Sequence, residues 1–359
     1  PQGAATRRVG SQFIAEVKTS ANKTRLIPFE FSTTQTYVLE FGNTYIRFYK
    51  DKGQILDSGS AYEISSPYLT AELFEIKFAQ SADVMYIVHP DHKPRKLART
   101  GHTSWTLTDV DFKRGPYLDS NTGSTTMTPS GTSGSVTITA STSTFVAGDV
   151  GRLIKIKDGH AKITNYSSGT QVTATTTDDF AATSAETDWA LGSWSSVLGY
   201  PKTVSFFEQR LIFGGSTNYP QTVWASESGL YEEFDAGDGS AADAFIYTIA
   251  ANRVNVIRWL APARDLIVGT VGGEFKVGRP TGEPLKPDNV QITQQTTFGG
   301  YTTTPIQIGN AVLFVQRQQR KVREFSYRFE DDAYLAPDMT LLAEHITDSG
   351  ITQMDYQQE

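Results

Sequence analysis

The chain has 359 residues, a net charge of −7 and no cysteine, and 38% of its residues are hydrophobic. The absence of cysteine excludes disulfides, thiolate metal sites and cysteine nucleophiles. The acidic balance disfavours a general nucleic-acid-binding surface, and no apolar run is long enough to span a membrane.

Two alternating stretches near the start predict β-strands, Ser11–Val17 and Arg25–Phe31. In the second stretch every other residue is apolar, so one face of that strand should be buried.

Five strand–turn–strand units then follow, each with a short apolar run, a turn and a second run that completes a hairpin. They cover residues 37–49, 83–97, 210–226, 265–277 and 310–325. Apart from one block of different composition, they recur about every 50 residues, which is typical of β-propeller blades. We therefore expect an all-β fold with β-propeller-like repeats.

The block that interrupts the repeats, residues 119–195, is rich in Ser, Thr and Gly. Asn121–Ser135 has almost no apolar residue and predicts a flexible linker. Short strand patterns follow it and predict a small β-barrel or sandwich domain, inserted into a propeller loop and folding apart from the propeller. The expected parts are 1–118 with the N-terminal strands and first blades, 119–195 as the inserted domain, and 196–359 with the remaining blades.

The last part is expected to end in a short helix. Asp338 can cap a helix over Met339–His345, in which Leu341, Leu342 and His345 share one face.

Several polar clusters invite a chemical interpretation, but each favours a simpler one. His89-Pro-Asp-His92 is ordinary turn chemistry rather than a metal site, and Asp235–Gly239 lacks the ligand pattern of a calcium loop. The adjacent pairs Glu232–Glu233 and Asp331–Asp332 would point to opposite faces of a strand, unlike the two acids of a glycosidase. We expect no catalytic residue, no cofactor and no metal.

One hairpin concentrates positive charge. Arg317, Arg320, Lys321 and Arg323 fall within seven residues and are candidates for contact with a neighbouring subunit or with DNA. The simpler alternative is a solvated turn.

Recognisable sequence segments lie along nearly the whole chain outside residues 119–194. They are Phe78–Asp91 with Pro94–Leu97, Arg210–Gly215 with Pro220–Trp224, Gly269–Phe275, Val315–Arg317 with Arg323–Glu324, and Leu341–Ile346. Together they resemble the tail nozzle proteins (tail tubular protein B-like) of short-tailed bacteriophages and prophages.

The resemblance implies a structural virion protein that contains a propeller and is not an enzyme. Six copies would form a homo-oligomeric ring at the distal end of the phage tail, below an adaptor ring and next to tail fibres or spikes. The ring would enclose the channel for DNA ejection, through which genomic DNA passes without tight binding. Since strong phosphate contacts would slow a sliding duplex, we then expect the basic hairpin to pair with carboxylates of a neighbouring subunit rather than with DNA. Assembly would take place in the bacterial host cytoplasm.

The alternative is a carbohydrate-binding or glycosidase-like propeller of a phage receptor-recognition protein. An enzyme of that kind needs a pocket with convergent carboxylates, whereas a ring subunit needs broad interfaces.

Overall fold

The computed structural model describes residues 10–237, 239–251, 255–280, 283 and 285–356. These residues form 29 strands and one 3₁₀ turn, η1 (Ala147–Asp149), with no α-helix among them. Accordingly, the described part of the chain has no helix that could cross a bilayer. The chain divides into two compact units: unit 1 is Pro1–Phe74, Gln80–Met85 and Leu97–Leu107, and unit 2 is Glu75–Ala79, Tyr86–Lys96 and Thr108–Glu359.

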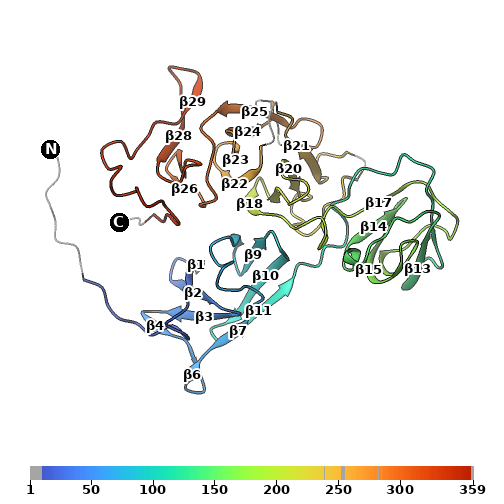
Figure 1. The fold of residues 1–359 in the computed structure, drawn as a ribbon, viewed down its shortest axis with the longest axis horizontal. Helices are drawn as coiled ribbons and strands as arrows, with labels where there is room; N and C mark the ends of the chain where they lie inside the picture. Colours follow the sequence, from blue (N-terminus) through green and yellow to red (C-terminus); the bar gives the residue numbers. More distant parts are fainter. Residues whose placement is uncertain (1–9, 238, 252–254, 281–282, 284, 357–359) are drawn as a thin grey trace. The chain divides into compact units, whose positions relative to one another are not determined.

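Five antiparallel sheets, here called blades 1 to 5, are built from strands that pair in chain order (Figure 1). Blade 1 consists of β1 (Arg25–Ser32), β2 (Gln35–Gly42), β3 (Tyr45–Lys50), β4 (Gly53–Gln54) and β7 (Glu63–Ser65). Between β4 and β7 lies a small hairpin of β5 (Leu56–Asp57) and β6 (Ser60–Ala61).

The other four blades have four strands each. Blade 2 consists of β8 (Lys77–Ser81), β9 (Val84–His89), β10 (His92–Gly101) and β11 (Ser104–Asp109). Blade 3 consists of β18 (Thr203–Phe207), β19 (Arg210–Gly214), β20 (Thr222–Ala225) and β21 (Phe245–Thr248). Blade 4 consists of β22 (Ile257–Pro262), β23 (Leu266–Thr270), β24 (Glu274–Gly278) and β25 (Gln291–Thr296). Blade 5 consists of β26 (Ile306–Ile308), β27 (Ala311–Val315), β28 (Val322–Arg328) and β29 (Ala333–Leu335).

The five hairpins predicted from the sequence are confirmed, and each supplies the second and third strands of one blade. Close packing determines which residue type fits at some positions of these hairpins. A Cβ on Gly269 of β23 would lie 1.9 Å from the indole of Trp259 on β22, so the cross-strand ring leaves room for glycine alone. The all-β fold with β-propeller-like repeats is the architecture of the chain.

The central strands of blades 3 and 4 are buried on both faces. All five residues of β19 and of β23 are buried. Along β23, Leu266 and Val268 pack into a core shared with blade 3, whereas Ile267 packs into a core shared with blade 5. Because successive strand residues point to opposite faces, blade 4 is held by blade 3 on one side and by blade 5 on the other.

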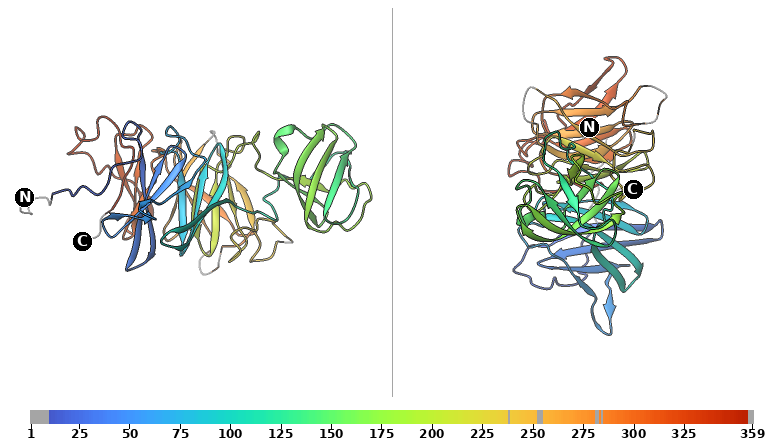
Figure 2. Two further views of the ribbon diagram at one scale, coloured as in Figure 1. Left: turned by 90° about the horizontal axis from the view of Figure 1, so that it is seen from below. Right: turned by 90° about the vertical axis from the view of Figure 1, so that its right-hand side faces the viewer.

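The inserted domain is a six-stranded curled sheet in the order β12-β13-β16-β15-β14-β17 (Figure 2). Its strands are β12 (Met127–Pro129), β13 (Ser135–Ala140), β14 (Leu153–Ile156), β15 (Gly159–Ser168), β16 (Gln171–Asp178) and β17 (Trp189–Leu191). Met127 and Glu186 exchange backbone hydrogen bonds of 2.8 and 2.9 Å, which close the sheet on itself. With a core of its own around Ile138, Ile154 and Val172, the insertion is the small barrel that the sequence predicted.

The predicted flexible linker over Asn121–Ser135 is wrong. This stretch contains β12, and the Asn121 amide donates to the carbonyls of Gly123, Thr125 and Thr187 at 2.9–3.1 Å. Hydrogen bonds at the sheet edge and the buried residues Met127 and Pro129 hold the segment in place although it has few apolar residues.

At the N-terminus one strand prediction is confirmed and one is wrong. In β1 buried and exposed residues alternate from Arg25 to Glu30, as expected. Ser11–Val17 belongs to none of the sheets, and Phe13 is 81% exposed. Alternation without a partner strand does not form a ladder.

The predicted helix over Met339–His345 is also wrong, and the segment forms successive turns instead. Its N–H groups bond three residues back, from Ala343 to Thr340 at 2.8 Å and from Ile346 to Ala343 at 2.9 Å. Asp338 caps Thr340 as expected, but the Met339 N–H bonds to Val322 of β28. A helix of seven residues has little stability without a packed face, and Leu342 is 95% exposed.

Burial of the blade strands makes a direct prediction. Trp224 and Phe213 are 1% and 0% exposed, and truncating either to Ala should lower the free energy of unfolding by about 3–5 kcal/mol. Tyr247→Ala, on the partly exposed strand β21, should cost less than about 1 kcal/mol. Urea denaturation measures all three, and a loss near that of Tyr247→Ala for both core variants contradicts the packing.

Candidate functional site

The basic residues predicted as a contact site lie on the turn between β27 and β28. Gln316 and Lys321 close this turn with a backbone hydrogen bond of 2.8 Å, and Gln319 adopts a positive φ of 68°. The Arg317 N–H bonds to the carbonyl of Gly299, which ties the turn to the loop that enters blade 5. The hairpin is therefore fixed at both its strands and its turn.

Two of the four cations are paired by the C-terminal segment of the same chain. Lys321 Nζ lies 2.8 Å from Asp338 Oδ2 and 3.1 Å from Glu344 Oε1. Arg320 lies 3.0 Å from Asp348, with both side chains more than half exposed. We expected these cations to pair with carboxylates of a neighbouring subunit. In the structure, carboxylates of the same chain pair with them instead.

The ion pair with Lys321 changes the pKa of Asp338. Partial burial raises the pKa of Asp338, but hydrogen bonds from Lys321 and Thr340 outweigh burial and lower the pKa to about 2. The pair therefore stays charged over the whole physiological range, although exposed pairs of this kind stabilise a fold by only about 0–1 kcal/mol.

Arg323 and Arg317 have different surroundings. The guanidinium of Arg323 lies 3.5 Å from the ring centre of Phe298 and donates to Ala336 O at 2.5 Å and to Gln316 Oε1 at 2.9 Å. The side chain of Arg317 is exposed and makes no ion pair with any residue that the structure describes. Of the four predicted contact residues, only Arg317 has no charged or aromatic partner among the described residues.

Beneath this hairpin lies a carboxyl group that the sequence did not reveal. Glu274, at the start of β24, is 0% exposed and accepts a hydrogen bond from the Thr296 hydroxyl. Burial raises the pKa of Glu274 to about 7, although the Thr296 hydroxyl, the Phe298 N–H and the charge of Arg323 all act to lower it. Its Oε1 atom has no hydrogen-bond partner among the described residues.

Glu274 sits against the loop that joins blade 4 to blade 5. Gly300 N donates to Thr270 O at 2.7 Å, and a Cβ on Gly299, whose φ is +75°, would lie 2.1 Å from Val271 O. Only glycine fits this approach of two backbones. The buried acid, the glycine and Arg323 together hold the crossover that supports the basic hairpin.

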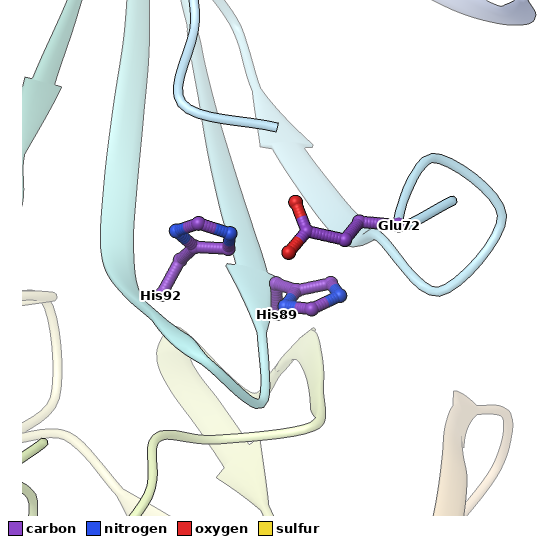
Figure 3. A group of neighbouring side chains, drawn as sticks. All are labelled: Glu72, His89 and His92. Atoms are coloured by element: carbon purple, nitrogen blue, oxygen red, sulfur yellow. The ribbon is translucent and has the colours of Figure 1, made fainter. Parts of the chain in front are cut away.

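The remaining sequence candidates occupy turns. His89 and His92 flank the β9–β10 turn, with ring centres 5.1 Å apart (Figure 3); Glu72, also drawn there, belongs to the other compact unit. Asp91 N donates to His89 Nδ1 at 3.2 Å, which places the proton of a neutral His89 on Nε2. That tautomer suits a hydrogen-bonded turn, the interpretation favoured from the sequence, better than a metal ligand.

The acidic candidates are engaged singly. Glu232 accepts from Lys96 Nζ at 2.5 Å and from Tyr86 at 3.1 Å. Asp235 binds Lys155 of the barrel at 3.0 Å, while Asp238 lies outside the described residues. Asp331 and Asp332 lie in the β28–β29 turn, not in a strand as assumed, and Asp332 accepts from Tyr327 at 2.6 Å.

Another structural residue escaped the sequence reasoning. Arg210 is 2% exposed and donates to the carbonyls of Ser226, Ala241, Ala242 and Asp243 at 2.6–3.2 Å. It closes the long β20–β21 connection from within blade 3. An arginine and a glutamate at the first position of strands β19 and β24 give no signal of burial in a sequence, because charged residues are common beside turns.

Comparison with known proteins does not assign the chain to a family. No protein-family model matches the chain, and no curated protein matches it either. Solved structures with a similar course include Hsv2 of Kluyvelomyces marxianus (9% identity, TM-score 0.37, covering 86% of this chain and 82% of that one). Others are a candidate 6-phosphogluconolactonase of Bacteroides fragilis (12%, 0.37, 88% and 82%) and the Cps50 (Swd1) β-propeller domain of Myceliophteria thermophila (9%, 0.32, 85% and 80%). At these TM-scores the similarities carry no functional argument.

The raised pKa of Glu274 predicts a pH dependence of stability. Because the folded state holds the proton more tightly than the unfolded state, this contribution is complete below about pH 4.5 and lost as the pH rises through about 7. Between pH 4.5 and 8 the wild-type protein should lose on the order of 3 kcal/mol of its free energy of unfolding. Glu274→Gln, which mimics the protonated acid, should not show this loss. Urea denaturation across this range measures it, with the exposed Glu330→Gln as control. Parallel pH profiles for wild type and Glu274→Gln would show that the acid is solvated.

Proposed function

We propose that this protein is a structural, non-enzymatic subunit of a bacteriophage virion, part of the nozzle ring at the distal end of a short tail. Support comes from the sequence resemblance, whose segments lie on blades 2 to 5 and on the C-terminal segment. The ring would contain six copies, lie below an adaptor ring and surround the ejected DNA.

The observation that best supports this proposal is an apolar segment that is exposed to solvent. Met339, Leu341, Leu342 and Ile346 are 55%, 68%, 95% and 74% exposed, all within eight residues. Contiguous apolar surface on a soluble protein commonly marks a site of protein association. Leu341–Ile346 is also one of the segments on which the resemblance rests, so we assign this stretch to contact with another copy.

The surroundings of the basic hairpin agree with a conduit that DNA passes without being held. Asp338, Glu344 and Asp348 offset the charges of Arg320 and Lys321. A wall with a net negative charge repels a duplex and keeps it hydrated, whereas free cations would bind its phosphates.

Association can be tested with one substitution. Leu342→Asp should abolish assembly of the chain, because it places a charge in the proposed contact while leaving the nearly fully exposed side chain free in the monomer. Leu230→Asp, at a site 51% exposed on blade 3, is the matched control and should assemble as wild type. Native mass spectrometry measures both. A wild-type chain that stays monomeric, or a Leu342→Asp variant that still forms rings, contradicts the proposal.

DNA binding gives a second test. The wild-type protein should bind duplex DNA no more tightly than about 10⁻⁴ M near physiological salt, and Arg320→Ala with Lys321→Ala should change little. Replacing the three carboxylates (Asp338→Asn, Glu344→Gln, Asp348→Asn) should instead tighten binding, since it frees the cations. Titration of labelled duplex at several salt concentrations measures this. Micromolar wild-type binding whose salt dependence falls in the Arg320→Ala, Lys321→Ala variant would make the hairpin a DNA grip.

A further inference from the structure

A groove lies between blades 4 and 5, at the end opposite the basic hairpin. It consists of two adjoining hollows of about 400 and 310 Å³, which share Arg264, Tyr327 and Tyr334 in their lining. The walls come from the β22–β23 turn, the β26–β27 turn and the β28–β29 hairpin. This combined size is within the range of small-molecule sites in proteins.

One wall of the groove is a rigid aromatic surface. Tyr334 stacks on Phe325 with ring centres 4.8 Å apart and meets the edge of Tyr327 at 5.5 Å. The Tyr334 hydroxyl donates to Asp265 Oδ2 at 3.2 Å and the Tyr327 hydroxyl to Asp332 Oδ1 at 2.6 Å. Both rings are thus fixed in orientation, while Tyr327 keeps 40% of its surface exposed. Burial and the charge of Asp265 raise the pKa of Tyr334 to about 12, so this hydroxyl remains a donor at neutral pH.

One cation of the groove, Arg264, has no carboxylate partner of its own among the described residues. Lys276 lies 3.7 Å from Asp265, and Arg279 pairs with Glu208. Arg264 is exposed and forms no ion pair or side-chain hydrogen bond with any residue in the described part of the chain. Asp332, bonded to the neutral Tyr327 hydroxyl, balances the total charge, so Arg264 offers a local partner for a single carboxylate rather than a positively charged groove.

Polar side chains complete the lining. Gln307, Asn310 and Ser326 border the larger hollow, and Asp265 and Asp332 border the smaller one. Amides and hydroxyls both donate and accept hydrogen bonds, whereas carboxylates accept from hydroxyl groups. Together they complement a ligand rich in hydroxyls, with an apolar face for the tyrosine.

We propose that this groove binds an acidic saccharide, with a pyranose ring against Tyr327, hydroxyls on the carboxylates and amides, and the sugar carboxylate on Arg264. A nucleic acid fits less well, because Asp265 and Asp332 would repel successive phosphates. The inference is independent of ring assembly, since blades 4 and 5 of a single chain supply every residue.

The test uses the whole chain with aldotriouronic acid, a trimer that carries a single uronic acid, and with its methyl ester, which lacks the charge. Titration calorimetry should show binding of the acid with a Kd on the order of 1 mM and weaker binding of the ester. Arg264→Gln should weaken binding of the acid by about tenfold and leave that of the ester unchanged. Tyr327→Ala should weaken both about fivefold or more, and Tyr327→Phe should retain most of the ester binding.

Two controls separate the groove from the rest of the surface. Arg317→Gln and Tyr247→Ala alter an exposed arginine and a partly exposed tyrosine outside the groove, and should bind both sugars as wild type does. Thermal unfolding verifies that each variant is folded. The proposal is overturned if neither trimer binds at 10-fold the expected Kd, or if Arg264→Gln and Tyr327→Ala bind as wild type. It is also overturned if an acidic peptide or a single-stranded oligonucleotide competes through Arg264 and binds more tightly than the trimer.

Discussion

Burial of the central blade strands on both faces is the constraint on which the rest of the structure depends. A strand such as β23 can be apolar at every position only because one neighbouring blade covers Leu266 and Val268 and the other covers Ile267. No blade of this kind can bury its own hydrophobic surface without a neighbouring blade. The loop between blades 4 and 5 is closely packed for this reason, with Gly299 against Val271 and Glu274 beneath it. Within blade 3, Arg210 donates to four carbonyl groups of the long β20–β21 connection.

The same constraint shapes the surfaces that blade 5 presents. At one end of this blade, the β27–β28 turn carries the basic residues, and the C-terminal segment binds them with its own carboxylates while exposing its apolar side chains. At the other end, the turns of blades 4 and 5 border a groove whose wall includes the stacked rings of Phe325 and Tyr334. Blade 5 therefore has an exposed apolar segment at one end and borders a polar, aromatic groove at the other.

Sequence reasoning found the blades because their signal is local. Each hairpin has both strands and its turn within about fifteen residues, so apolar runs and glycines were sufficient. It failed where the outcome depends on distant partners. The sequence predicts that Asp338 caps a helix, but the Met339 N–H bonds to Val322, more than a dozen residues away, and no helix forms. The polar composition after Asn121 predicts a linker because it does not reveal the hydrogen bond from Asn121 to the distant carbonyl of Thr187. Glu274 and Arg264 carry no sequence signal, since burial and a missing ion pair exist only in the folded chain.

The independence of the blades from the barrel is where this account is most directly testable. An aromatic cluster of Phe112, Trp194, Phe213 and Trp224, with neighbouring ring centres 5.2–6.0 Å apart, covers the second face of blade 3. The chain leaves for the barrel after Phe112 and returns before Trp194, with Ser193 N bonded to Pro116 O at 2.8 Å. Joining Pro116 to Ser193 through a short Gly-Ser linker removes the barrel and keeps the cluster. Hydrogen exchange and urea unfolding should then show one cooperative transition, with the amides of β19 and β23 still the most protected. Aggregation of the shortened chain, or loss of that protection, would show that the barrel is part of the blade core.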